Sequence, residues 1–588
     1  MFELSKNEAK KNLDAVKSWL NTYKYDALYV SSFDIYLNEY VPLKENHRYY
    51  LSAFSGSVAE LVVMANSRAL LFVDGRYYEQ ADLEVDSQEV EVVKCIMGES
   101  LSQRVLKEIE SRKVTKVAFE SDRTSYQFQI ELSKKAKIFS LDNEELFKVI
   151  NFEREIFEGQ IISLPTQLCS PSSSEKIEKL LNPGEALFIS ALDEIAWLSN
   201  ARSYAIPYQA TFAAKALAIY PKTDRPRLII FLTSNQVPSN DLLSREDLQF
   251  KSCVKQGVFQ QHLFQSHIKN IFDKLELNSL YIDESKINAK DFQTLRTTSN
   301  LELRPALITI NSLQSIKDSH EIKSFEYAFT SASCAIFQAF SWALDKVEKS
   351  DDITEKLFCE FLEKSYKAQG ASAQSFSSIV GFKENGSIIH YSKPSDKVFL
   401  KKDHLLLVDS GGFFEGGLAT DCTRTMHMGG EVSKRQKLLY TLVLKGLLQA
   451  QNAVFPKNTL GCQIDALARN PLRSIGLDYA HGTGHGVGVN VHEGGFRLSN
   501  ISTTPLKEGQ VGSIEPGVYI PGELGIRLEN VAVVEKHPEF KDMLCFRPLN
   551  YIGYDFKLID FDLLDHNEKK WLNDYHEVCR QRGVLFPE

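Results

Sequence analysis

An internal repeat in the first half of the sequence constrains the fold more than any other feature. DALYVSSFD at residues 26–34 aligns with EALFISALD at residues 185–193, an offset of 159 residues. RALLFV at residues 68–73 aligns with RLIIFL at residues 227–232 at the same offset. Self-similarity at one fixed spacing is typical of a duplicated structural unit. The sequence therefore predicts two consecutive domains of the same fold.

Short apolar strands alternate with helical stretches in both copies, for example at residues 103–111 and 259–275, which predicts α/β layers. The repeat register places the opening helix of the second copy just after the serine-rich run that ends at Ser174. A long helix over residues 316–349 is expected to open a third domain. Its stripe of Ile322, Phe325, Phe329, Cys334, Phe337 and Phe340 is expected to be core packing. The predicted domains are residues 1–151, 152–312 and 313–588.

Composition and charge exclude several classes of protein. Hydrophobic residues make up 43% and charged residues 25% of the 588 residues, as in ordinary globular proteins. The net charge of −9 argues against nucleic acid or an anionic membrane as a partner. The 9 cysteines form no CxxC pair, which favours a reducing compartment. The first residues read as an amphipathic helix without the apolar core of a signal peptide, so we expect a cytoplasmic protein that does not enter the membrane.

The last third of the chain carries four carboxylates and one imidazole in patches of unusual sequence. The patches are LLLVDSGG with Asp409, LATDCTRT with Asp421, HGTGHGVG with His485, GSIEPGVY with Glu515 and GIRLEN with Glu529. Taken singly, each acid could instead be a turn or cap residue, and a lone histidine could be a hydrogen-bonded core residue. The alternating glycines of the histidine patch indicate close backbone approach, and the patch lacks the lysine of a phosphate loop.

Strand periodicity predicts that these acids converge. LLLV before Asp409 and the alternating segment 420–426 read as an antiparallel hairpin around a glycine-rich turn. The segments 511–520 and 525–534 form a second predicted pair, which carries Glu515 and Glu529. Four acids on one sheet face could not all ionise in a dry site unless cations were bound. Two divalent ions, charge +4 against −4, would remove this repulsion.

The five patches in this order, with VHEGG following the histidine patch, resemble the metal motifs of aminopeptidase P, the Xaa-Pro aminopeptidases of the pita-bread metallopeptidase (creatinase) family. The resemblance runs from DGRYY near Asp74 to WLNDYHEVCR at Trp571. It implies an α/β (α+β) fold with two creatinase-N-terminal-like domains and a C-terminal pita-bread catalytic domain. The sequence departs from the family at EPGVY, at a slightly longer loop between Asp409 and Asp421, and at NARSYAIPYQATF in the middle domain.

The resemblance implies a dinuclear aminopeptidase that hydrolyses the bond between an N-terminal residue and a following proline. Two divalent ions would be held by the five residues named above, and a metal lowers the pKa of bound water from about 15.7 toward about 7. The oxygen-rich ligand set favours manganese, and zinc or cobalt are also permitted. Glu515 would accept the proton of the water and pass it toward the leaving amine. The partners are peptides with proline at the second position.

The resemblance places four further residues around the substrate. His390 and His492 would donate hydrogen bonds to the developing oxyanion, since a neutral imidazole beside a dication is suited to that task. His481 would lie near a pocket for the proline ring. Arg76, in VDGRYY, would reach the peptide from the first domain, and its alternative is an ion pair at the start of a helix.

Rival functions come from two classes. A prolidase-like Xaa-Pro dipeptidase or a creatinase-type hydrolase would share the catalytic fold, and a non-catalytic histone- or peptide-binding module would share it without the metal residues. Oligomeric state depends on the apolar tail from residue 549 onward. The tail either folds back on its own domain or covers a partner, and the resemblance favours a homodimer.

Overall fold

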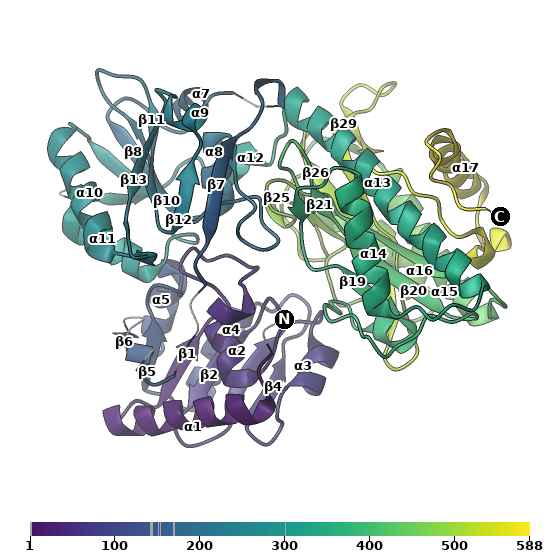
Figure 1. The fold of residues 1–588 in the computed structure, drawn as a ribbon, viewed down its shortest axis with the longest axis horizontal. Coiled ribbons are helices and arrows are strands. Elements are labelled where there is room, and N and C mark those ends of the chain that lie inside the picture. Colours follow the sequence, from purple (N-terminus) through teal and green to yellow (C-terminus); the bar gives the residue numbers. More distant parts are fainter. Residues whose placement is uncertain are drawn as a thin grey trace. The chain divides into compact units, whose positions relative to one another are not determined.

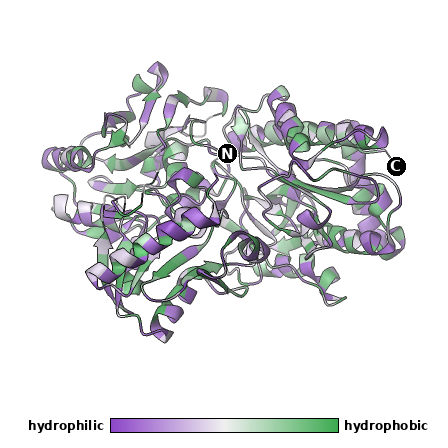
Figure 2. Ribbon diagram, turned by 60° about the horizontal axis from the view of Figure 1, so that its bottom comes forward, coloured by the Kyte–Doolittle hydropathy of each residue, from purple (hydrophilic) through white to green (hydrophobic). Residues whose placement is uncertain are grey.

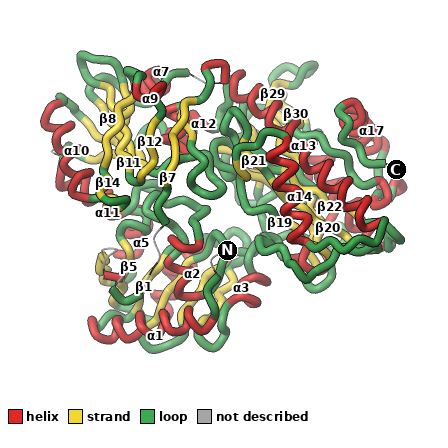
Figure 3. The backbone as a smooth tube through the Cα atoms, in the orientation of Figure 1, coloured by secondary structure: helices red, strands yellow, loops and turns green. Residues whose placement is uncertain are grey.

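The computed structural model describes residues 3–141, 145–146, 148–150, 152, 155–168, 171–299 and 301–587. Asn151, the last residue of the predicted first domain, lies outside the described residues. The chain divides into two compact units. The first unit comprises residues 1–163, 171–206 and 211–310, and the second comprises residues 164–170, 207–210 and 311–588. Each unit contains both helices and strands (Figure 3).

The first domain is a six-stranded sheet with the strand order β4-β3-β2-β1-β5-β6. Its strands are β1 (Ala27–Val30), β2 (Glu60–Met64), β3 (Ala69–Val73), β4 (Val90–Lys94), β5 (Lys116–Glu120) and β6 (Lys137–Leu141). Strand β2 is antiparallel to β1 and β3, and the other neighbours are parallel. The helices are α1 (Lys6–Tyr23), α2 (His47–Ser52), α3 (Tyr78–Glu84), α4 (Leu101–Ser111) and α5 (Tyr126–Ser133).

The second domain repeats this sheet strand for strand, with the order β13-β11-β10-β8-β16-β17. Its strands are β8 (Glu185–Ile189), β10 (Ala214–Tyr220), β11 (Arg227–Leu232), β13 (Leu248–Ser252), β16 (Ser279–Ile282) and β17 (Leu303–Pro305). Strand β10 is antiparallel to β8 and β11, and the other neighbours are parallel. The repeated sequences fall on the equivalent strands β1 and β8 and on β3 and β11. The predicted duplication is therefore confirmed.

Smaller elements complete the second domain. Its helices are α7 (Ser173–Glu178), α8 (Leu192–Ser199), α9 (Asn240–Leu243), α10 (Gln261–Lys274) and α11 (Ala289–Thr298). Two short sheets are formed by β7 (Glu158–Ser163), β9 (Ala201–Arg202) and β12 (Asn235–Pro238), and by β14 (Val254–Lys255) and β15 (Val258–Phe259). The divergent segment NARSYAIPYQATF spans residues 200–212, and its residues 207–210 belong to the second unit.

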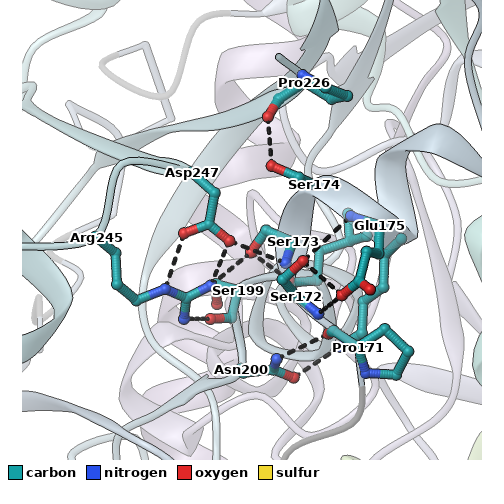
Figure 4. A network of polar contacts seen from close by, with 12 residues as sticks. Pro171, Ser172, Ser173, Ser174, Glu175, Ser199, Asn200, Pro226, Arg245 and Asp247 are labelled. Carbon is teal, nitrogen blue, oxygen red and sulfur yellow. Dashed lines mark hydrogen bonds and ion pairs between the residues drawn. The ribbon is translucent and has the colours of Figure 1, made fainter.

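The serine-rich run is part of a helix start, which corrects the expectation that the helix begins after it. Helix α7 begins at Ser173, inside the run, and Ser172 is its N-cap. The Ser172 hydroxyl accepts a hydrogen bond from the Glu175 amide, and the Glu175 carboxylate accepts one from the Ser172 amide. Figure 4 shows the neighbouring network, in which Asp247 accepts hydrogen bonds from the Ser173 amide and from Arg245. Serine at the N-cap with glutamate three residues later is a capping box.

Apolar residues concentrate on the strands, while the helices carry both polar and apolar residues, as the colouring of Figure 2 shows. Helix α1 confirms the predicted amphipathic start, because Leu13, Val16 and Leu20 are buried on one face. Among the helices that the structure describes, none combines the length and the apolar character that a membrane span requires.

Helices α12 (Ile310–Gln314), α13 (Ser319–Glu348) and α14 (Glu355–Ala368) follow the duplicated domains (Figure 1). The prediction of one helix over residues 316–349 is wrong at its start, because α13 begins only at Ser319. Asp318 caps it, and Glu321 completes a capping box. Phe325, Phe329 and Phe340 are fully buried, as expected for core packing.

The strands of the second unit form several sheets. A three-stranded sheet has the order β19 (Ile379–Phe382), β20 (Leu405–Ser410), β22 (Cys422–His427). A six-stranded sheet has the order β23 (Val454–Pro456), β30 (Met543–Pro548), β29 (Asn530–Lys536), β26 (Val511–Ile514), β24 (Gly484–Gly486), β25 (Glu493–Leu498). Two pairs are β18 (Ala373–Gln374) with β21 (Gly412–Phe413) and β27 (Gly517–Ile520) with β28 (Leu524–Arg527). The remaining helices are α15 (Lys434–Gln451), α16 (Gly461–Arg473) and α17 (His566–Gln581).

The apolar tail packs against its own domain, which was one of the two expected arrangements. Tyr554, Leu572 and Tyr575 are buried. The fully buried Arg424 of β22 donates hydrogen bonds to the Ile552 carbonyl at 3.0 Å and to the Tyr575 hydroxyl at 2.8 Å. The tail therefore completes the core of the second unit, while Phe561 and Leu563 remain exposed.

Candidate metal centre

Asp409 and Asp421 lie on the predicted antiparallel hairpin. Strands β20 and β22 pair with Asp409 opposite Thr423 and Ser410 opposite Cys422. The loop between them requires glycine at Gly411, because a Cβ atom there would lie 1.8 Å from the Thr420 carbonyl oxygen. The hairpin thus places the first two acids side by side, with Asp409 9% and Asp421 5% exposed.

Glu515 and Glu529 lie at breaks between strands and not within the continuous strands that the sequence predicted. Glu515 falls between β26 and β27, where Pro516 has no amide hydrogen for the ladder, and Glu529 falls between β28 and β29. At the breaks the backbone pairs elsewhere: the Glu515 amide donates to the Thr483 carbonyl, and the Glu529 amide donates to the Thr423 carbonyl. The break at Glu529 therefore draws its acid toward the three-stranded sheet, whereas the Glu515 amide stays paired with the segment before β24, a strand of the same six-stranded sheet as β26.

The acids consequently do not share one sheet face, which corrects the expectation from periodicity. Asp409 and Asp421 come from the three-stranded sheet, whereas Glu515 and Glu529 lie between the six-stranded sheet and the β27–β28 pair. Several sheet edges converge on the centre.

His485 on β24 faces the carboxylates. Its Nε2 atom lies 3.3 Å from Glu515 Oε1 and 3.5 Å from Asp421 Oδ2. Its Nδ1 atom lies 3.0 Å from the Gly486 carbonyl oxygen, so Nδ1 donates there and Nε2 presents its lone pair to the centre. Ligand atoms of Asp421, His485 and Glu529 all lie within 4.8 Å of one another. This spacing suits a shared metal ion.

The electrostatics of the centre favour bound cations. Burial, followed by the charges of Glu529 and Asp409, holds the pKa of Asp421 well above its usual range. Burial, followed by the charges of Glu515 and Asp409, does the same for the pKa of Glu529. Burial raises the pKa of Glu515 to about 7, and Arg527 opposes this rise. The four acids thus repel one another as predicted, and a positive charge between them would relieve the repulsion.

Unsatisfied oxygen atoms show that the residues fit a metal. Asp409 Oδ1, Asp421 Oδ1 and Glu529 Oε1 are buried and have no hydrogen-bond partner among the described residues. Buried carboxylate oxygens without a partner are costly in a protein without an ion. Carboxylates and one imidazole are ligands for hard and borderline divalent ions.

Sequence reasoning missed the residues that support the acids. Arg527 donates to Asp409 Oδ2 at 2.7 Å, Thr423 donates to Glu529 Oε2 at 2.8 Å, and Ser513 donates to Glu515 Oε1 at 3.1 Å. Each of the three stands two residues from a predicted ligand, so the alternation of a strand could have revealed them. Arg527 also changes the charge balance of the centre, because its guanidinium group already neutralises part of the negative charge of the four acids.

The predicted histidines fall around this centre. The His492 ring centroid is 4.3 Å from that of His485 in an edge-on arrangement. His481 Nε2 lies 2.9 Å from the Tyr519 hydroxyl, which accepts a hydrogen bond from Arg527. For His390, the preceding residue Ile389 accepts a hydrogen bond from Arg527 Nη1 at 3.4 Å. Arg527 therefore connects the surroundings of His481 and His390 to Asp409.

Arg76 forms a forked ion pair within its own domain. Its Nε and Nη2 atoms donate to the two Asp74 carboxylate oxygens at 3.0 and 2.8 Å. Helix α3 begins at Tyr78, so the structure shows an ion pair at the start of a helix. A role toward the peptide stays a prediction.

Comparison with known proteins matches this architecture. The model of the creatinase/prolidase N-terminal domain matches residues 12–151 and, in a second form, residues 153–321. The model of metallopeptidase family M24 matches residues 329–536, and that of its C-terminal region matches residues 542–583.

Relatives and solved structures agree with these matches. A probable Xaa-Pro aminopeptidase P of Laccaria bicolor is 31% identical over 96% of this chain and 89% of its own. Xaa-Pro aminopeptidase 1 of Dictyostelium discoideum is 30% identical over 98% and 94%. The X-prolyl aminopeptidase of Caenorhabditis elegans, described as a cytosolic enzyme with a di-nuclear active site, superposes with a TM-score of 0.85 at 22% identity, over 98% of this chain and 97% of its own.

A duplicated creatinase-type domain followed by this cluster of acids and histidine defines a metallopeptidase of family M24. Within that class, the chain belongs to the Xaa-Pro aminopeptidase P family. The fold expected from the sequence, two creatinase-type domains and a C-terminal pita-bread domain, is thereby confirmed.

Proposed function

We propose that this protein is an aminopeptidase that removes the N-terminal residue of peptides whose second residue is proline. The observation that carries the proposal is the convergence of Asp421, His485 and Glu529 within 4.8 Å, with Glu515 beside them and Asp409 on the paired strand. The names of the relatives support the same activity. The five residues would hold two divalent ions, most favourably manganese, with zinc or cobalt as alternatives.

The ions would supply a water molecule of lowered pKa and would polarise the scissile carbonyl. Glu515 is suited to move the proton, because its Oε1 atom lies 3.3 Å from His485 Nε2 at the candidate centre and is held by Ser513. It would take the proton of the attacking water and deliver it to the leaving amine. His492, beside His485, and His390 would donate hydrogen bonds to the developing oxyanion.

His481 would form one wall of the pocket that receives the proline ring. Its imidazole is fixed by the Tyr519 hydroxyl and by its contact with the Gly482 carbonyl, so its position is rigid. Proline has no amide hydrogen, so a peptidase acting there needs shape recognition of the ring in place of strand pairing.

Hydrolysis of an Arg-Pro-Pro peptide tests the proposal. Protein stripped with a chelator should be inactive, and added manganese should restore release of arginine. Two ions per chain by mass spectrometry are expected in the restored protein. Turnover of only the Arg-Pro dipeptide would favour a prolidase, and absence of both metal and turnover would favour a binding module.

Domain boundaries, cellular location and oligomeric state are also matters of proposal. We propose domain boundaries at residues 151/152 and 312/313, supported by the two complete sheets and by the unit boundary after Ile310. A cytoplasmic location is supported by the description of the C. elegans relative. We also propose a homodimer on the family resemblance alone, since the core residues of the tail pack against its own unit. Sedimentation at micromolar concentration should give twice the mass of 66.6 kDa, and a monomer would refute it.

A further inference from the structure

The carboxylate of Glu355 collects hydrogen bonds from one segment of the second unit. Its Oε1 atom accepts from the Phe382 amide at 2.8 Å and from Asn385 Nδ2 at 3.0 Å. Its Oε2 atom accepts from the Tyr391 hydroxyl and the Ser395 amide, both at 2.9 Å. The donors span residues 382–395, which we call the His390 loop. The two oxygens of Glu355 thus fix both ends and the middle of this loop.

The placement of this charge is unusual for a residue without a metal or substrate partner. Glu355 is fully buried, and among the described residues no ion pair includes it. Burial raises the pKa of Glu355, and the four hydrogen bonds oppose this rise, as does its position as the first residue of α14, where the helix dipole favours an anion. A buried acid held only by donors of one loop is a device for fixing that loop.

The opposite side of the His390 loop is held by β28. Arg527 at the end of β28 donates to the Ile389 carbonyl and also to Asp409. Gly525 packs directly on the loop, since a Cβ atom there would lie 1.7 Å from the Gly386 carbonyl oxygen. His390 therefore stands between Ile389, held by Arg527, and Tyr391, held by Glu355.

We propose that Glu355 is a positioning residue that fixes His390 for the reaction. The inference rests on the proposed function, in which His390 donates to the oxyanion. Glu355 contacts neither the candidate ligands nor the reacting atoms, and acts through the backbone on both sides of His390. A misplacement of about 1 Å at a catalytic group can cost a factor of about 10² in rate.

Glu355→Gln is a sharp perturbation because it keeps the shape of the side chain. Whichever oxygen becomes an amide nitrogen, two of the four donors then face another donor. The matched control is Glu360→Gln, the same change at an exposed position of α14. Tyr391→Phe removes only the hydroxyl donor and serves as a milder variant if Glu355→Gln does not fold.

Two measurements are independent of turnover. Hydrogen exchange of the Phe382 and Ser395 amides should quicken at least tenfold in Glu355→Gln and stay unchanged in Glu360→Gln. The metal content should remain that of the wild type, because none of the five candidate ligands lies in the His390 loop or receives a hydrogen bond from Glu355. These measurements hold even if no Xaa-Pro peptide is cleaved, so failure of the proposed function and failure of this inference are distinguishable.

The kinetic test compares Glu355→Gln in two backgrounds. Alone it should lower kcat by a factor on the order of 10² with little change in KM. In a His390→Ala background it should lower kcat no further, because residues that act as a unit are not additive. An equal loss in both backgrounds, unchanged amide exchange, or loss of metal would each overturn the proposal. Tyr391→Phe should shift the same readouts in the same direction by a smaller factor.

Discussion

Replacing Lys317 by methionine should destabilise the second unit by about 3 kcal/mol. Lys317 and Glu493 form an ion pair in which both side chains are only 1% exposed. Lys317 Nζ also donates to the Gln314 carbonyl at 2.8 Å. Removing one member of a buried pair costs about 3–5 kcal/mol, because the other charge loses its compensation. We expect the lower end, because Gln314 Nε2 still donates to Glu493 at 2.7 Å.

The pair also bears on the metal centre. Glu493 opens β25 opposite Gly486, the neighbour of His485, and a Cβ atom on Gly488 would lie 1.7 Å from the Glu493 carboxylate. The Glu493 side chain is thus enclosed by the glycine-rich backbone that presents the histidine. Loss of Lys317 should loosen this backbone and weaken metal binding as well as stability.

Thermal unfolding of the whole chain, followed by circular dichroism, provides the assay. A loss of 3 kcal/mol corresponds to a fall in Tm of about 6–12 °C for a domain of this size. Lys349→Met is the control, because that lysine pairs with Asp345 at the surface and such pairs contribute about 0–1 kcal/mol. The double variant Lys317→Met, Glu493→Gln should lose less than the sum of its parts. A change in Tm no larger than that of the control would refute the reasoning.

Asp421→Asn should remove metal and activity together, and turnover near that of the wild type would contradict the ligand assignment. His492→Ala should keep the metal but lower kcat by a factor on the order of 10² to 10³, and loss of metal would show that it is a ligand. In metal-free protein the pKa of Glu515 is raised from 4.5 to about 7, so between pH 4.5 and about pH 7 the folded state binds more protons than the unfolded state. Its stability should therefore fall as pH rises through this window, and a urea midpoint that rises with pH would contradict this.

Strand period and turn chemistry were enough to bring Asp409 and Asp421 together, because a glycine-rich turn between an apolar strand and an alternating one leaves few other pairings. The breaks at Glu515 and Glu529 escaped this reasoning, since periodicity assumes a continuous strand. Pro516 was a visible signal of the first break. The second has no local signal, because it depends on the backbone partner that Thr423 supplies from another sheet.

Capping residues explain why the start of α13 was predicted too early. The start of α13 could have been read from Asp318 and Glu321, which form a capping box, in preference to extending the apolar stripe upstream. The link between Glu355 and the His390 loop could not, because it joins residues that are 27 to 40 positions apart, and two of the four donors are backbone amides, which leave no trace in residue identity.

The burial of Arg424 beneath the tail has a consequence for how the protein is made. Arg424 donates to the Glu529 carbonyl, and its remaining partners include Ile552 and Tyr575, which are synthesised after all five candidate ligands. Domains fold as units during synthesis, the N-terminal ones first. The duplicated domains can therefore be complete on the ribosome while the strands bearing the acids still lack partners. A nonsense codon shortly after β29 would yield a chain with two folded domains and no metal centre.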